Sequence, residues 1–245
     1  DPLADADTVD TELMLSDLEA LEKREANLRK KATTKDKDAI AELELVDLAL
    51  AELQAGRPAR CADIPKGRER DFKNLQLITA KPVIYVCNVE EDSAADGNSL
   101  SAKVAEKAAA EGAQAVVISA RIEEELAQRD DSERLEYLDT LGLSEPGLNR
   151  LIRQGYDLLE LITYFTAGPK EARAWTIRRG TPAPQAAGVI HTDFERGFIR
   201  AETIGYEDYT ELNGEQGARD AGRLRQEGKD YVVQDGDVML FRFNV

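Results

Sequence analysis

The sequence predicts an α/β protein with an inserted α-helical hairpin and a small α+β module in its C-terminal third. Two short apolar runs, 83–87 and 115–118, flank a helical segment, and this β-α-β order is typical of a parallel sheet. Two long segments with apolar residues every three or four positions precede the first run and indicate paired helices. From residue 163 onward, short strand-like runs separated by turns replace this pattern.

Two amphipathic segments occupy the N-terminal part of the chain. Apolar side chains recur at helical spacing over 8–31 and again over 36–53. The polar stretch 33–36 interrupts the pattern, and Gly56 and Pro58 close the second segment. Two helices joined by a short polar turn form an antiparallel hairpin. A plain structural arm and a lever or docking arm for a partner both fit this hairpin.

The central strand of the α/β part is predicted at 83–87, after a segment expected to be helical over 68–79. Its run of apolar residues has no polar alternation, so we expect a strand buried on both faces. Asn88 stands where this strand ends, and ligands of open α/β sheets bind outside the carboxyl ends of the strands. The loop that begins at Asn88 is therefore a candidate ligand-binding loop. A polar turn without a ligand is the plain alternative.

The rest of the α/β part follows the same logic. A helix predicted at 99–111 and ended by Gly112 leads to the second strand, 115–118. Residues 121–139 are expected to be helical with a solvated, charged face. An apolar-periodic helix is predicted at 148–162, and we expect it to pack on the sheet.

The C-terminal module is predicted to contain short strands with few helices, which indicates an α+β fold. The predicted elements are strands 163–166 and 172–177 around a Gly168-Pro169 turn, a short helix near 185–190, a strand 198–204, a helical patch within 214–228, and closing strands 231–233 and 238–243. Because Gln-Asp-Gly-Asp at 234–237 is a strong turn sequence, we expect the two closing strands to pair as a hairpin.

Charge and cysteine content exclude several classes of function. The chain has 32 basic and 48 acidic residues, a net charge of −16, and so lacks the basic field of a general nucleic-acid binder. We therefore expect no DNA partner. Cys61 and Cys87 do not make a disulfide framework and fit a reducing compartment. No apolar run is long enough for a membrane span and no signal peptide is visible, so no membrane partner is expected.

The exit of the central strand, residues 88–91, reads Asn-Val-Glu-Glu. In P-loop GTPases this strand ends in Asn-Lys-x-Asp, which reads guanine; here Val89 fills the Lys position and Glu91 the Asp position. The Asn-x-x-Glu form resembles the YchF/Obg-like ATPase family, whose members prefer ATP. Ser-Ala directly after the second strand is similar to the loop that P-loop GTPases place beside the base. The resemblance implies that ATP is bound through five residues: Asn88, Val89, Glu91, Ser119 and Ala120.

The hydrogen-bonding groups of guanine and adenine indicate the same base preference as this resemblance. Guanine offers two adjacent donors, which a short Asp carboxylate accepts together. Adenine offers an amine beside a ring acceptor, and that acceptor repels a carboxylate. Glu91 moves the acid one methylene outward and so changes this geometry. Asn88 can both donate and accept at a purine edge, because an amide has donors and acceptors.

Residues 163–245 resemble the TGS domain of YchF-type ATPases, a β-grasp module also similar to modules of threonyl-tRNA synthetases and stringent-response enzymes. The stretches that carry the resemblance are 165–168, 171–177, 186–202 and 233–238, together with Glu-Pro-Gly-Leu-Asn-Arg at 145–150. The resemblance implies a partial P-loop NTPase sheet with an inserted helical hairpin, followed by the β-grasp domain. Its domains are the OBG-type nucleotide-binding part at 1–9 and 66–162, the hairpin or coiled-coil insertion at 10–65, and the TGS domain at 163–245.

A phosphate-binding loop, Gly-x-x-x-x-Gly-Lys-Ser/Thr, does not occur in this sequence. We expect this loop, the switch segments and the Mg²⁺ ligands to precede residue 1, since the chain opens with Asp-Pro-Leu rather than Met. No catalytic or metal-binding residue is therefore expected here, and the chain alone is expected to be inactive. The resemblance implies a cytoplasmic, ribosome-associated protein that binds and hydrolyses ATP with Mg²⁺ and also binds GTP weakly. A non-enzymatic module that docks to ribosomes or RNA is the alternative.

The C-terminal module is the better candidate for contact with the ribosome. Of the net charge of −16, residues 163–245 hold only −2 and the first 162 residues hold −14. Five arginines of this module could gather on one face and bind phosphates: Arg173, Arg178, Arg179, Arg196 and Arg200. In the alternative interpretation they form ordinary surface pairs with nearby acids: Glu171, Asp193, Glu195 and Glu202.

Four single residues have more than one interpretation. His191 lacks a nearby nucleophile pattern and a second metal ligand, which favours a structural or recognition role over catalysis. Oxidation of Cys87 would disturb base binding at the neighbouring Asn88, whereas a buried, inert thiol is the alternative. Cys61 lies in a predicted loop, so we expect an exposed, reactive thiol. Trp175 is expected in the core of the module.

Overall fold

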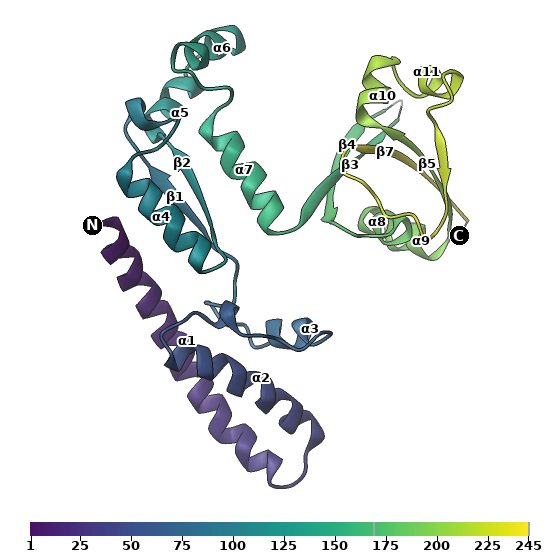
Figure 1. Cartoon of the computed structure of the whole chain (residues 1–245). Coiled ribbons are helices and arrows are strands. Elements are labelled where there is room, and N and C mark those ends of the chain that lie inside the picture. The colour runs from purple at the N-terminus through teal and green to yellow at the C-terminus, as the bar shows by residue number, and fades with distance from the viewer. Residues whose placement is uncertain (169, 245) are drawn as a thin grey trace. The chain divides into compact units, whose positions relative to one another are not determined.

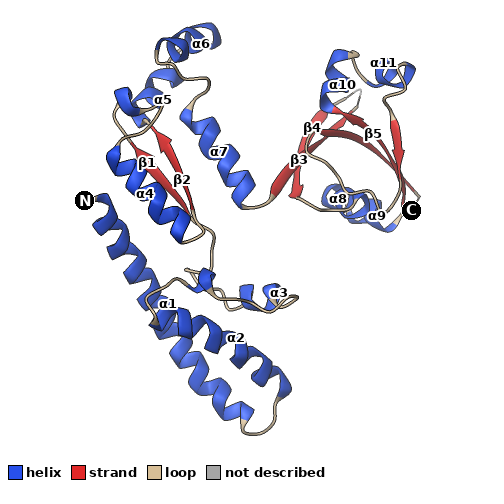
Figure 2. Ribbon diagram, viewed as in Figure 1, coloured by secondary structure: helices blue, strands red, loops and turns tan. Residues whose placement is uncertain are grey.

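The computed structural model describes residues 1–168 and 170–244, which form two compact units, Asp1–Gln154 and Gly155–Val245 (Figure 1). The predicted fold class is confirmed. The N-terminal unit combines a helical hairpin with a parallel β-α-β arrangement, and the C-terminal unit is a mixed sheet with short helices (Figure 2).

The hairpin consists of α1 (Pro2–Ala32) and α2 (Lys37–Gln54). Helix α1 begins earlier than the apolar periodicity predicts, because Asp1 caps the amide of Leu3 and Pro2 occupies the first turn. Asp36 caps α2 through the amides of Asp38 and Ala39. The two helices share a core of buried apolar side chains, among them Leu21, Leu28, Leu45, Val46 and Leu50.

The segment that follows the hairpin corrects the predicted helix at 68–79. After a 3₁₀ turn (η1, Ala59–Cys61), only α3 (Glu69–Lys73) is helical, and Gln76 takes a left-handed φ of 58°. The backbone amides of Ile78 and Thr79 donate to the buried carboxylate of Asp17 on α1. Because these amides bind Asp17 instead of helix carbonyls, the chain beyond α3 follows the surface of the hairpin.

The β-α-β arrangement forms as predicted. Strand β1 (Ile84–Asn88) pairs in parallel with β2 (Gln114–Ile118), and α4 (Ser99–Ala110) connects them. The expectation that the first strand is buried on both faces is wrong. Val86 is 46% exposed, because β1 pairs with β2 alone among the described strands.

The charged segment after β2 contains two helices, α5 (Ala120–Ala127) and α6 (Asp131–Thr140), because Asp130 starts a new helix with a capping box. Helix α7 (Gly147–Leu158) is shorter than predicted, and Ile162 belongs to a strand. The apolar face of α7 does not pack on β1 and β2 as expected. Gly147 is the buried residue of this helix, whereas Leu148 and Ile152 are exposed.

The C-terminal unit is built on five strands in the order β4-β3-β7-β5-β6, namely β3 (Leu161–Ala167), β4 (Ala172–Arg178), β5 (Phe198–Gly205), β6 (Arg225–Glu227) and β7 (Asp237–Phe243). Its helices are α8 (Ala183–Ile190), α9 (Thr192–Arg196), α10 (Tyr206–Glu211) and α11 (Glu215–Asp220). The predicted hairpin of β3 and β4 is present, although Pro169 of its turn lies outside the described residues. Tyr164 is completely buried, and its hydroxyl donates to the carbonyl of Ala186 on α8.

The expected hairpin between 231–233 and 238–243 is wrong. Strand β7 pairs with β5 and β3, while Val232 forms an isolated bridge with Pro182. The carboxylate of Asp237 explains the difference: it is 3% exposed and accepts from the Tyr231 hydroxyl and the Gln234 amide. These bonds hold the turn compact and direct the chain into the centre of the sheet.

Candidate nucleotide-binding site

Parallel pairing of β1 and β2 brings the two predicted ligand loops together. Asn88 lies opposite Ile118 in register, so the loops that begin at Asn88 and Ser119 leave the sheet side by side. The Asn88 Oδ1 accepts a hydrogen bond of 2.9 Å from the amide of Ala120. The amide of Val89 donates to the carbonyl of Ile118 at 2.9 Å. These contacts place Asn88, Val89, Ser119 and Ala120 in one group at the carboxyl edge of the strands.

The bond to Ala120 defines what the Asn88 side chain offers to a ligand. Since the amide oxygen accepts from Ala120, the amide nitrogen is left with its two donors. The Asn88 side chain is exposed and forms no second hydrogen bond with a described residue. Asn88 therefore has two free donors but an occupied oxygen, which is a narrower role than the donor-and-acceptor role that the sequence alone allows.

Glu91, the fifth predicted site residue, belongs to the same loop as Asn88 and starts a 3₁₀ turn, η2 (Glu91–Ser93). Its Oε1 forms an ion pair with the Nε of Arg121 at 2.6 Å, and Arg121 lies in the first turn of α5. This ion pair joins the two loops. Sequence reasoning missed Arg121, although its position directly after Ser-Ala was a usable signal.

Ser119 occupies the N-cap position of α5 without forming a side-chain capping bond. The residue is 3% exposed, and its hydroxyl has no hydrogen-bond partner in the described part of the chain. Buried hydroxyls are usually hydrogen-bonded, so an unpaired one beside Asn88 fits a place where a ligand supplies the partner. The residues present thus fit a purine ligand in their donor set and in this buried hydroxyl.

A cavity of about 400 Å³ opens beside β1. Its lining is formed by β1, the starts of α1 and α4, and the loop after β1, with the residues Pro2, Ala6, Tyr85, Val86, Cys87, Asn88, Val89, Asn98, Leu100, Ser101 and Val104. Asn88 and Val89 therefore belong both to the cavity and to the paired loops, and the cavity is large enough to hold part of a small ligand.

The start of α7 packs against the end of β2. The Gly147 amide donates to the Glu123 carboxylate on α5 at 2.7 Å. A Cβ at position 147 would lie 3.0 Å from the Ile118 side chain, so a larger residue would displace this turn. Gly147 and Glu123 thus hold α5 in place, and through α5 the Ser119 loop; neither role was predicted from the sequence.

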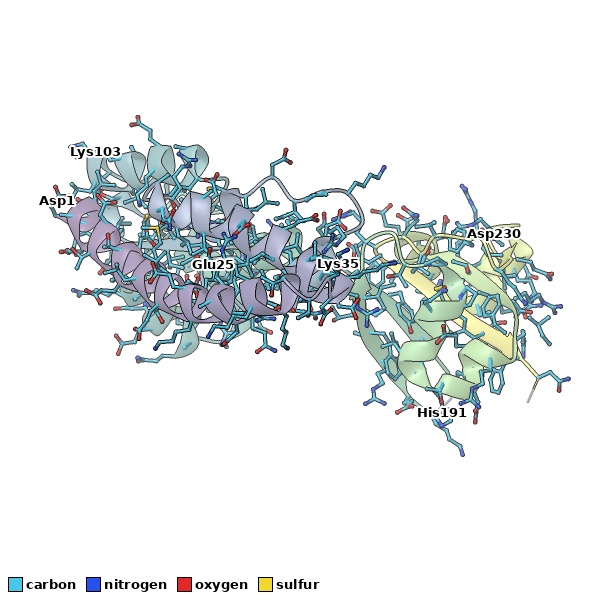
Figure 3. The ribbon with its side chains drawn as sticks, turned by 90° about the horizontal axis from the view of Figure 1, so that it is seen from below. Asp1, Glu25, Lys35, Lys103, His191 and Asp230 are labelled. Carbon is cyan, nitrogen blue, oxygen red and sulfur yellow. The ribbon has the colours of Figure 1, made fainter. Side chains whose placement is uncertain are left out.

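Two cysteines, a histidine and a tryptophan were also singled out in the sequence, and the structure shows their surroundings. Cys87 is half-buried, and burial raises the pKa of its thiol; Cys61 is exposed, as predicted. His191 lies on the outer surface of the C-terminal unit, and its Nδ1 accepts from the Asp193 amide at the start of α9 (Figure 3). Trp175 is partly buried rather than fully in the core, with the Arg173 guanidinium 4.6 Å from its ring centre.

Within the described part of the chain, no group of three or more His, Cys, Asp or Glu residues is arranged to hold a metal ion. Among the described helices, none combines the length and apolarity that crossing a bilayer requires.

The chain is similar over its whole length to curated proteins named ribosome-binding ATPase YchF. The protein from Bacillus subtilis is 49% identical over 247 residues, which cover all of this chain and 68% of that protein. The protein from Haemophilus influenzae is 52% identical over 245 residues, covering 67% of its length. The chain belongs to the YchF family. A domain profile of this family, YchF-GTPase_C, described as a protein of unknown function (DUF933), matches residues 161–244.

A solved YchF structure supports the family assignment at the level of the fold. The YchF GTPase of Schizosaccharomyces pombe matches with a TM-score of 0.85 and 35% identity, over 99% of this chain and 66% of that one. A GTP-binding protein from Pyrococcus horikoshii matches with a TM-score of 0.61 and 17% identity, which shows a shared fold. The chain thus spans about two thirds of the length of its YchF relatives.

Proposed function

We propose that this chain is the base-reading and partner-docking part of an ATP-binding, ATP-hydrolysing protein that associates with ribosomes. Family membership supports this proposal, because the relatives carry the name ribosome-binding ATPase. The geometry at the strand ends supports the nucleotide part. In particular, the Ala120 amide occupies the Asn88 side-chain oxygen and leaves its two donors free, beside the Ser119 hydroxyl, which has no partner among the described residues.

In this proposal the adenine ring lies between the two loops. The Asn88 amide donates to a ring nitrogen, and the backbone at Val89 contacts the base. Glu91 accepts from the exocyclic amine, while Ser119 and Ala120 line the opposite side. Val89 supplies a backbone contact because its apolar side chain offers no hydrogen bond.

Hydrolysis needs phosphate-positioning and charge-stabilising groups that this sequence does not contain. We place the phosphate-binding loop and the Mg²⁺ ligands in an upstream segment, within the part of its relatives' length that this chain does not span. This chain together with that segment is called the extended protein below. The chain by itself fits the second candidate function, a non-enzymatic docking module, because no Gly-x-x-x-x-Gly-Lys-Ser/Thr sequence occurs in it.

The C-terminal unit is proposed to act as the TGS-type docking module for the ribosome. Arg178 and Arg179 are exposed at the end of β4. Arg178 forms no ion pair with a described residue, and Arg179 lies 3.6 Å from the exposed Asp157. Regulation by oxidation of Cys61 or Cys87 is also part of the proposal; exposure favours Cys61 as the reactive thiol.

The test of the nucleotide assignment is calorimetric titration of the extended protein with ATP and GTP. ATP is expected to bind more tightly, and Glu91→Asp is expected to narrow the difference. Asn88→Asp keeps an oxygen for the Ala120 amide but replaces the two donors with a repelling carboxylate oxygen. It is expected to weaken ATP binding about tenfold or more, since the hydrogen bond to the ring is lost and replaced by repulsion, without lowering the melting temperature.

Asn27→Asp on the exposed surface of α1 is the matched control and should leave ATP binding unchanged. Equal or tighter GTP binding by the unmodified extended protein would contradict the ATP assignment. The chain without the upstream segment is expected to release no phosphate from ATP. Mg²⁺-dependent release by highly purified chain that disappears in Asn88→Asp would show that the chain is itself an ATPase.

A further inference from the structure

The ion pair between Glu91 and Arg121 leads to an inference that rests on the proposed function and makes it more specific. We propose that Arg121 determines the purine specificity of the site by occupying the Glu91 carboxylate. In this proposal the side chain that selects adenine over guanine is the arginine, and Glu91 alone would favour the opposite base.

The pair is built from the two loops that surround the proposed base position. Glu91 follows β1, and Arg121 directly follows Ala120 in the first turn of α5. Their Oε1–Nε distance is 2.6 Å, and neither forms another ion pair with a described residue. The Glu91 side chain is 37% exposed and that of Arg121 is 73% exposed, so a ligand between the loops can reach both groups.

The two purines make different demands on such a pair. Guanine presents two adjacent donors, which a free carboxylate satisfies with both of its oxygens. Arg121 pairs with one of the two Glu91 oxygens and offsets the negative charge. Only one carboxylate oxygen is then free to accept from the two donors of guanine. Adenine presents an amine beside a ring acceptor. The free Glu91 oxygen can accept from this amine, and the guanidinium reduces the repulsion between the carboxylate and the ring nitrogen.

An exposed ion pair of this kind adds little to folding stability. Its removal is therefore expected to change nucleotide preference while leaving the fold intact. This separates a specificity role from a merely structural one, because a structural role would lower the melting temperature and the affinities for both nucleotides together.

The experiment measures the affinities for ATP and GTP of the extended protein and of four variants. Arg121→Gln is expected to lower the ratio of ATP to GTP affinity roughly three- to tenfold, about the effect of one exposed hydrogen bond, mainly through tighter GTP binding. Arg121→Lys keeps the charge and should retain most of the preference. Arg121→Gln combined with Glu91→Gln should not bind GTP more tightly, because a neutral amide cannot accept both guanine donors.

Arg57→Gln is the matched control, since the Arg57 Nε binds the Glu52 carboxylate at 2.7 Å on the exposed surface of the hairpin. It should leave the ratio unchanged. If ATP binds and Arg121→Gln leaves the ratio unchanged, the inference is overturned while the proposed function stands. If the unmodified extended protein binds neither nucleotide, the proposed function fails and the inference fails with it.

Discussion

At the scale of single residues, this protein places buried carboxylates where they replace regular secondary structure. Asp17 on α1 is 4% exposed and accepts from the Ile78 amide at 2.9 Å and from the Thr79 amide and hydroxyl at 2.7 Å each. The Thr79 hydroxyl in turn accepts from the Ala59 amide at 3.0 Å. This network joins the hairpin to the segment that leads into β1.

Asp17→Asn tests this network. One of the two acceptor oxygens becomes a donor, so buried amides lose their partner, and the N-terminal unit should lose about 2 to 4 kcal/mol of stability. Urea unfolding followed by far-ultraviolet circular dichroism measures the change. Glu12→Gln, an exposed change on the same helix, is the control and should stay within about 0.5 kcal/mol of the unmodified chain. A loss no larger than that of the control would show that the network is dispensable.

At the scale of elements, the C-terminal sheet is joined across β5 and β7 by a charged ladder. Glu202 on β5 is 8% exposed and accepts from Arg242 on β7 at 3.0 Å, with Arg200 at 3.6 Å. The hydrogen bond from Arg242 lowers the pKa of Glu202, and this effect exceeds the opposing effect of desolvation. Opposite charges on neighbouring strands thus stabilise the central pairing of the sheet.

The direction of this shift predicts the pH dependence of the C-terminal unit. Because the pKa of Glu202 in the folded chain lies below its ordinary value of 4.5, the stabilisation is fully present above that value. It is lost as the pH falls through the lower, folded value. Between pH values near neutrality and the acid range, urea midpoints should therefore fall more steeply for the unmodified chain than for Glu202→Gln.

Trp175, the single tryptophan, lies in the C-terminal unit, so its fluorescence reports the unfolding of that unit. Glu171→Gln changes an exposed carboxylate of the same unit and should keep the full pH dependence. Parallel pH profiles for the unmodified chain and Glu202→Gln would mean that the ladder does not contribute.

At the scale of the whole molecule, charge is distributed unevenly between the two ends of the sequence. Charged side chains project along the length of α1 (Figure 3), and the first 162 residues hold −14 of the net charge of −16. The sequence allowed two roles for the arginines of the C-terminal unit, a shared phosphate-binding face or ordinary surface ion pairs, and the structure supports neither for all five. Arg196 and Arg200 lie near Asp193 and Glu202, whereas strand alternation directs Arg173 and Arg178 to opposite faces of β4.

Because the five arginines do not share one face, the docking prediction concentrates on Arg178 and Arg179. Arg178→Glu with Arg179→Glu should weaken co-sedimentation with ribosomes, and the unmodified chain should dissociate steeply as salt is raised. Lys30→Glu with Lys31→Glu makes an equal charge change on the hairpin and should have a smaller effect, because the hairpin is not the proposed docking element. Unchanged co-sedimentation after the arginine reversals would remove this surface from the proposal.

The sequence by itself determined the features that depend on local pattern. Helical periodicity defined the hairpin, apolar runs defined β1 and β2, and the β-α-β order defined their parallel pairing. The sequence also identified the residues at the strand ends. Parallel pairing of β1 and β2 places Asn88 opposite Ile118, and so beside the Ser119 loop. The assignment of these residues to a nucleotide stays a prediction that the proposed titrations test.

The tertiary structure decided the features that depend on contacts between distant residues. Asp17 takes the amides of 78 and 79 and ends the expected helix, and Asp237 turns the expected hairpin into a central strand of the sheet. The Ala120 amide occupies the oxygen of the Asn88 side chain and leaves its nitrogen free, and Arg121 forms an ion pair with Glu91 from another loop. The contacts of Asp17, Asn88 and Arg121 join residues far apart in sequence, whereas Asp237 binds residues of its own turn and becomes buried in the sheet. Local propensity and spacing encode neither the distant contacts nor this burial.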